Sequence, residues 1–300
     1  MKMPIRETRE TAKVHTLLEC DARKTIPWAH FRIPPFPQVA IKVLKVANND
    51  GMSMCQISDL VSSDPAFCSE VLTVANSAAV PHRFPVTSIE QAVAMLGTNN
   101  LKGLCLTVAA RSYLGKSIEV GALRTVWVHS LASALIARRL VLVGLTDDDT
   151  AYTAGLLHEI GRLALAVLSP RDYANLLGSH SGSPDSILPY EREMFGCDHI
   201  QLGRHMVAEW KLPPEFDPVV SSKDLLGVSH ARLDLADSIH ISCRMANTAG
   251  YPAFPGCEMT PYDELLEELP TSERRRFYAD INQLASEIGR ELRTVDRFNT

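Results

Sequence analysis

Signals for the start of a helix recur along this chain, and signals for strands are nearly absent. The segments Thr87-Ser88-Ile89-Glu90 and Asp198-His199-Ile200-Gln201 each place a capping residue three positions before an acidic or amide side chain. Such pairs satisfy backbone N–H groups that the first turn of a helix leaves without partners. Asp64-Pro65 and Ser169-Pro170 add a capping residue followed by a proline, whose fixed φ suits the first helical position. The sequence therefore predicts an all-α protein.

The predicted helices divide into three regions. Residues 27–115 form an N-terminal helical part, residues 120–250 form a multi-helical core, and residues 258–300 form a C-terminal helical extension. The first boundary falls between a helix that ends at Leu114 and a long helix that begins at Gly121. The predicted helices span residues 36–49, 54–62, 65–76, 88–96, 99–114, 121–143, 148–158, 160–168, 170–178, 186–195, 199–210, 214–221, 229–248, 261–268 and 272–293.

The charge balance argues against a general attraction to nucleic acid. The chain has 30 basic and 35 acidic residues, a formal net charge of −5, so it has no overall positive field. Its compact basic run, Arg274-Arg275-Arg276, follows residues 258–273, which carry acids and no bases. This pattern favours a solvated helix face over a phosphate site. Nucleic acid is therefore not an expected partner.

Cysteine usage and the N-terminus favour a cytoplasmic protein. The seven cysteines are scattered and form no C-x-x-C pair, which is the pattern of reduced thiols. Residues 1–10 are charged and lack the apolar core of a signal peptide. No uncharged run approaches the roughly 18 residues that a membrane-spanning helix needs. We expect no membrane association.

One imidazole and one carboxylate stand side by side in a very apolar stretch. His158 and Glu159 lie within residues 155–165, where a buried carboxylate needs a cation or hydrogen bonds. His129 and Asp237 lie in two other apolar helices, and side chains from packed helices can share one ion. Imidazole and carboxylate ligands suit iron, manganese, nickel or zinc. We therefore expect one divalent metal ion.

Each candidate residue also has a plainer interpretation. His129 can be a hydrogen-bonded histidine of the core, and Asp237 can pair with an arginine nearby in the sequence. His199 follows a capping residue and can simply start a surface helix. Arg162 can neutralise Glu159 or contact a phosphate. The residues alone leave these alternatives open.

The order of several motifs along the chain resembles the HDOD family. The motifs are Ile33 to Gln38, Asp64 to Ala78, Val86 to Gly97, Trp127-Val128-His129-Ser130, the segment around His158, Asp198 to Gly203, and Trp210-Lys211-Leu212-Pro213. The resemblance extends over residues 27–250. It implies a fold similar to that of the HD superfamily of metal-dependent phosphohydrolases, and a role in bacterial signalling or regulation.

The resemblance also implies a ligand set. It identifies the first HD ligand as His129, the His-Asp pair as His158 and Glu159, the closing aspartate as Asp237, and a further histidine of dinuclear relatives as His199. The sequence departs from the family pattern twice. A glutamate replaces the aspartate of the pair, and Ser221-Ser222 stands approximately where dinuclear relatives have two histidines. The second departure favours one metal ion over two.

Two functions agree with these observations. The first is a non-catalytic signalling or regulatory module that binds a partner protein or a small ligand and retains a metal ion for structure. The alternative is a mononuclear phosphohydrolase acting on nucleotides or cyclic nucleotides, in which the metal activates water and Arg162 steadies phosphate charge. An intact second set of ligands would favour the enzyme, and its absence favours the module.

An apolar stripe runs along the C-terminal segment. Phe277, Ile281, Leu284, Ile288 and Leu292 follow one another at steps of four, three, four and four residues. This spacing puts them on one face of a helix, and such a face must be buried. We expect it to pack on the core or on a second copy of the chain, which would make the protein a homo-oligomer.

Overall fold

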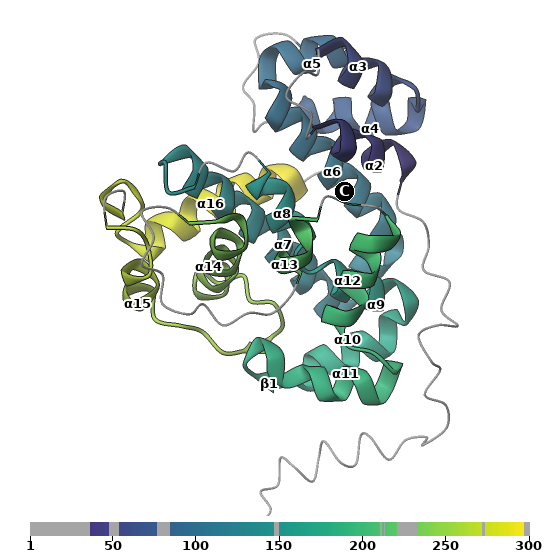
Figure 1. Cartoon of the computed structure of the whole chain (residues 1–300). Coiled ribbons are helices and arrows are strands. Elements are labelled where there is room, and N and C mark those ends of the chain that lie inside the picture. The colour runs from purple at the N-terminus through teal and green to yellow at the C-terminus, as the bar shows by residue number, and fades with distance from the viewer. Residues whose placement is uncertain are drawn as a thin grey trace, which may run out of the picture.

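The computed structural model is an assembly of helices, and its described part contains a single pair of very short strands (Figure 1). The structure describes residues 37–47, 54–76, 85–146, 150–210, 212, 214–220, 233–271 and 274–296. Helices α2 to α6 lie at one end of the molecule, and the helices from α7 onward form a larger body. The all-α prediction is confirmed.

The N-terminal bundle comprises α2 (Gln38–Ala47), α3 (Met54–Ser62), α4 (Pro65–Ala75), α5 (Ile89–Leu96) and α6 (Thr98–Leu114). α4 begins as predicted, because the Asp64 side chain accepts hydrogen bonds from two backbone N–H groups of the first turn. The bundle contacts the larger body through α6, which packs against α8 (Ala151–Leu157) and α9 (Ile160–Leu168).

Two predicted caps differ in detail. The N-cap of α5 is Ser88 rather than Thr87, and its Oγ accepts the Gln91 N–H at 3.2 Å. Glu90 accepts hydrogen bonds from the side chains of Ser58 on α3 and of Ser88, and the Gln91 side chain instead accepts the Thr87 N–H. At the start of α10 (Pro170–Ser179), the Ser169 hydroxyl donates to the Asp172 carboxylate and caps no backbone group. A nearby carboxylate thus competes with backbone N–H groups for the serine.

The larger body is organised around α7 (Gly121–Leu142), which packs against α8, α10 and α14 (Leu235–Thr248). Gly155 allows α8 to approach closely, since a Cβ there would lie 2.6 Å from the Ala134 Cα. Within the described ranges, α7 is the helix that is long and apolar enough to cross a membrane by length and composition alone. Its apolar window is 67% buried inside the protein, as expected of a central core helix.

The larger body also contains α11 (Leu188–Phe195), α12 (His199–Glu209) and α13 (Phe216–Val219), and α13 packs against α14. α12 starts with the predicted capping box, in which Asp198 and Gln201 each accept a backbone N–H from the other. α12 packs directly on α9, because a Cβ on Gly161 would lie 1.8 Å from the His199 carbonyl oxygen. Strand β1 (Ser181–Gly182) pairs in parallel with β2 (Gly256–Cys257).

Two predicted helix starts are corrected. α14 begins at Leu235 rather than at 229, because the Asp234 side chain accepts the N–H of Asp237, and residues 229–232 lie outside the described ranges. The single helix predicted over 272–293 is a 3₁₀ turn, η4 (Arg274–Arg276), followed by α16 (Ile281–Asp296). Arg274 turns back to donate to the carbonyls at the end of α15 (Tyr262–Glu267), and Asp280 accepts a backbone N–H at the start of α16.

The apolar stripe of α16 packs on the core. Leu284, Ile288 and Leu292 are buried, and α16 contacts α7. Ion pairs from Arg138 and Arg139 of α7 to Glu291 flank this contact. The expected packing of this face within the chain is therefore confirmed, whereas a homo-oligomer remains a prediction.

Candidate metal centre

Two histidines that the sequence proposes as ligands meet inside the larger body. His129 lies on α7 and is fully buried, and His158 lies in the turn that joins α8 to α9. Their Nε2 atoms are 3.2 Å apart, and their ring centroids are 5.2 Å apart. The close packing of α7 on α8 thus brings together two residues that are far apart in the sequence.

Backbone carbonyls orient both rings. His129 Nδ1 lies 2.8 Å from the Tyr251 oxygen, and His158 Nδ1 lies 2.7 Å from the Gly155 oxygen. Since a carbonyl only accepts, each Nδ1 carries the proton and each Nε2 of a neutral ring presents a lone pair. The two lone pairs therefore face each other and repel unless a cation lies between them.

Burial disfavours a proton as the cation between the two Nε2 atoms. It is the main reason that the pKa of His129 falls from 6.5 to about 4, and neighbouring His158 contributes to the shift. Burial also lowers the pKa of His158. Both rings are therefore neutral at pH 7, so a metal ion suits the pair better than an added proton.

A third ligand comes from Cys243 on α14. Its Sγ is 3.2 Å from His129 Nε2, and the ligand atoms of His129, His158 and Cys243 all lie within 4.8 Å of one another. Burial raises the pKa of the Cys243 thiol, and a bound cation would favour the thiolate. We call these three residues the metal-ligand group. The sequence carries no spacing signal for Cys243, because its partners come from other helices.

The metal-ligand group fits one metal ion. Ligand nitrogens on a tetrahedral zinc ion stand roughly 3.3 Å apart, given Zn–N bonds of about 2.0–2.1 Å. The observed distance between the two Nε2 atoms is 3.2 Å. A ring N–H bonded to a backbone carbonyl is also the usual support of a metal-binding histidine. Glu159 Oε1, 4.0 Å from His158 Nε2, adds a carboxylate at the edge of the group.

Arg162 on α9 holds Glu159. Arg162 Nε is 2.7 Å from Glu159 Oε2, and the arginine is fully buried. Burial alone would raise the pKa of Glu159, but the attraction of Arg162 outweighs it and brings the pKa to about 2. The guanidinium also donates to the Pro184 carbonyl and lies over the Phe254 ring. Of the two roles predicted for Arg162, the structure shows neutralisation of Glu159, and the buried guanidinium has no exposed face for a phosphate.

A second buried carboxylate, Glu191 of α11, is not among the site residues predicted from the sequence. It accepts hydrogen bonds from the Tyr173 hydroxyl at 2.7 Å and from the backbone N–H and Nδ1 of His199 at 2.8 and 2.6 Å. Burial raises the pKa of Glu191, but His199 and its hydrogen bonds bring the pKa below its ordinary value. His199 thus faces Glu191 and lies outside the metal-ligand group. The signal was present, since Ile187, Glu191 and Phe195 form one buried stripe.

Asp237 is not brought into the metal-ligand group. It is half-buried in the first turn of α14, where its backbone N–H donates to Asp234. Cys243 lies six residues further along α14, which is a different face of the helix, and this face meets the histidines. Cys243 therefore stands where the sequence analysis expected the closing aspartate. Ser221 and Ser222 lie outside the described residues.

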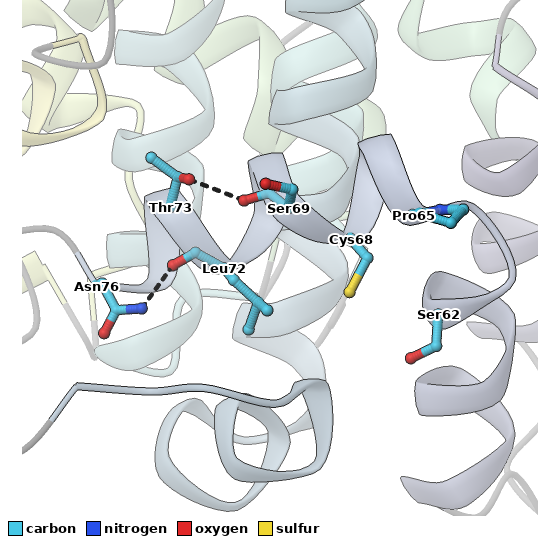
Figure 2. A pocket seen from close by; sticks show the side chains of 7 residues that line it. All are labelled: Ser62, Pro65, Cys68, Ser69, Leu72, Thr73 and Asn76. Carbon is cyan, nitrogen blue, oxygen red and sulfur yellow. Dashed lines mark hydrogen bonds between the residues drawn. The ribbon is translucent and has the colours of Figure 1, made fainter.

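A separate shallow groove lies on α4 (Figure 2). It is lined by Ser62, Pro65, Cys68, Ser69, Leu72, Thr73 and Asn76. Thr73 and Asn76 use their side chains to donate to carbonyls of α4 itself. The lining carries no charged side chain, so the groove offers less chemistry than the metal-ligand group.

The described part of the chain is an all-α protein that brings two histidines together inside its larger body. A family model for the HDOD domain matches residues 33–224, and the chain belongs to the HDOD family.

Three solved structures share this fold. An HDOD domain protein of unknown function from Geobacter sulfurreducens is 18% identical with a TM-score of 0.68, over 96% of this chain and 98% of that one. A candidate signal transduction protein from Marinobacter aquaeolei VT8 is 19% identical with a TM-score of 0.66, over 96% and 64%. A candidate phosphohydrolase from Shewanella amazonensis SB2B is 22% identical with a TM-score of 0.58, over 88% and 94%.

The chain also matches an uncharacterised protein of Treponema pallidum. The two are 24% identical over 196 residues, which is 63% of this chain. The match spans 36% of the Treponema protein, so that relative is much longer than the region shared with this chain.

Proposed function

We propose that this chain is a non-catalytic signalling or regulatory module that holds one divalent metal ion for structure and acts by binding a partner protein or a small ligand. Its HDOD membership and the name of the Marinobacter relative support the regulatory role. The observation that carries the proposal is the burial of Arg162, the predicted phosphate contact, between Glu159 and Glu191. In a phosphohydrolase this guanidinium would steady the charge of the phosphate, and a guanidinium paired with two buried carboxylates is not directed at a substrate.

His129, His158 and Cys243 would hold the ion. A thiolate donor favours zinc over manganese, because soft sulfur ligands select zinc. Zinc bound by these residues would supply folding free energy, since its ligands come from α7, α14 and the end of α8. Within this arrangement Arg162 keeps Glu159 ionised beside His158.

One observation favours a mononuclear phosphohydrolase as the second candidate. The metal-ligand group supplies three ligands, which is the number in catalytic zinc sites whose fourth position holds water. The name of the Shewanella relative is in keeping with this candidate.

Hydrolysis assays on metal-loaded protein distinguish the two functions. Purified protein is loaded with zinc, manganese, iron or nickel and tested on phosphomonoesters, nucleotides and cyclic dinucleotides, beside a His158→Ala control. We expect no turnover above the control. A turnover of about 1 per second would refute the non-catalytic proposal and establish the hydrolase, provided that the His158→Ala substitution abolishes it.

A further inference from the structure

Ion pairs join the C-terminal helix α16 to α7, the helix that carries His129. Arg138 and Arg139, nine and ten residues after His129 on α7, form ion pairs with Glu291 of α16. Arg139 also lies 3.6 Å from Glu287. α16 lies beyond residues 33–224, so this attachment is an addition to the region that the HDOD model matches.

Tyr251 connects α16 to the interior. Its hydroxyl donates to the Ala285 carbonyl at 3.3 Å. A Cβ on Gly289, one turn further along α16, would lie 2.8 Å from the same hydroxyl oxygen. The tyrosine therefore reaches α16 at a place where only a residue without a side chain leaves it room.

The end of α14 fixes the backbone of Tyr251. The Tyr251 N–H donates to the Ala246 carbonyl at 2.9 Å, and the Gly250 N–H donates to the Asn247 carbonyl at 3.2 Å. Gly250 has a φ of +93°, a conformation that favours glycine. These bonds form the Schellman arrangement that ends many helices. Tyr251 is thus held by α14 through its backbone and by α16 through its side chain.

The carbonyl of Tyr251 is the partner of His129. It accepts the Nδ1–H at 2.8 Å, which leaves Nε2 as the atom that faces His158 and Cys243. A metal-binding histidine depends on such a partner for both its tautomer and its ring orientation. We propose that Tyr251 is a positioning residue of the metal centre and that the docking of α16 on Tyr251 sets the metal affinity. This inference rests on the proposed metal site.

Two substitutions alter Tyr251 without touching a ligand. Tyr251→Phe removes the bond to Ala285, and Gly289→Ala pushes the hydroxyl away from α16. Tyr262→Phe is the matched control, because it removes a similar bond from a tyrosine hydroxyl to a backbone carbonyl, that of Tyr278, and leaves the contacts of Tyr251 in place. Zinc affinity is measured by competition with a chromophoric chelator. We expect a loss of roughly tenfold in the first two variants, the lower end of the range for losing the partner of a metal-binding histidine, because both variants displace the carbonyl without removing it, and no change in the control.

A second readout needs no metal. Nitrogen-15 chemical shifts of the His129 ring in metal-free protein report which nitrogen carries the proton. The parent should show the Nδ1–H form, and Tyr251→Phe and Gly289→Ala should move the ring towards a mixture of tautomers. An unchanged ring in both variants, or an equal loss of zinc affinity in Tyr262→Phe, would overturn the positioning role. Failure of the parent to bind zinc would instead overturn the proposed metal site.

Discussion

At the scale of single residues, the buried charges near the two histidines are paired with one another. Arg162 lies between Glu159 and Glu191, and Glu191 in turn accepts hydrogen bonds from Tyr173 and His199. Removing one member leaves another charge in a region without water, which costs more than the pair itself contributes.

Glu191→Gln should therefore destabilise the fold by on the order of 3 kcal/mol at pH 7. The glutamine oxygen can still accept a hydrogen bond from Tyr173. The glutamine NH₂ group only donates, so it cannot accept the two hydrogen bonds that His199 donates. The pKa of Glu191 is lowered in the folded state, so its contribution is present above the ordinary value of 4.5 and is lost as pH falls through the folded pKa. Urea unfolding measures the free energy of unfolding of both proteins. The difference in this free energy between parent and variant should become smaller as the pH falls below 4.5. A difference that stays constant into the acid range would contradict this account.

The cap of α5 gives a second test at this scale. Ser88→Ala should lower the free energy of unfolding by about 1 kcal/mol, because the Gln91 N–H loses its acceptor. Thr87→Ala is the control, since the Thr87 hydroxyl makes an exposed contact with the Gln91 side chain and caps no backbone group. Equal losses in chemical denaturation of the two variants would show that the cap is misassigned.

Site residues could be predicted from the sequence only where local context marks them. His158 and Glu159 stand out as polar residues in an apolar segment, and His129 stands out in the same way. Cys243 could not be found, because the rotation of α14 about its axis decides whether Asp237 or Cys243 meets the histidines. That rotation follows from packing between distant helices rather than from spacing within one.

At the scale of helices, two close approaches depend on glycine. Gly155 brings α8 onto α7, and Gly161 brings α9 onto α12. These contacts position His158, Glu159 and Arg162, which all lie between the two glycines or one residue beyond.

Gly161→Ala should lower the free energy of unfolding by roughly 3 kcal/mol, because the new methyl group would overlap the His199 carbonyl and force the helices apart. Gly178→Ala at an exposed position of α10 is the matched control, since a Cβ there meets nothing within 4 Å. The control should be neutral or more stable by up to about 1 kcal/mol, as alanine favours a helix. The melting temperatures of the two variants check this contrast, and equal values would contradict it.

Helices could be predicted well where side-chain caps and apolar period agree, as at Asp64 and Asp198. The prediction of one helix over 272–293 is wrong. The apolar spacing continues from Phe277 to Ile281, although the residues between η4 and α16 are not helical. That break depends on Arg274, which donates to the Glu267 and Leu269 carbonyls at and just beyond the end of α15, and on Asp280. Neither interaction is visible in an apolar period.

At the scale of the whole molecule, the C-terminal helix covers α7. Truncation after Pro270 should expose the surface under Leu284, Ile288 and Leu292 and remove the ion pairs to Arg138 and Arg139. We expect a lower melting temperature and lower solubility, since each buried leucine or isoleucine contributes on the order of 2 kcal/mol. Calorimetry and light scattering check this. A truncated protein with unchanged melting and oligomeric state would contradict it.

Elemental analysis of protein purified without an affinity tag tests most directly whether His129, His158 and Cys243 hold one metal ion. The parent is compared with His158→Ala and Cys243→Ser, and Cys68→Ser serves as a control cysteine from the groove on α4. We expect about one equivalent of zinc per chain in the parent and in the control, and a strong loss in the other two variants. A metal-free parent from zinc-supplemented culture, or a Cys243→Ser variant that keeps its full equivalent, would contradict this expectation.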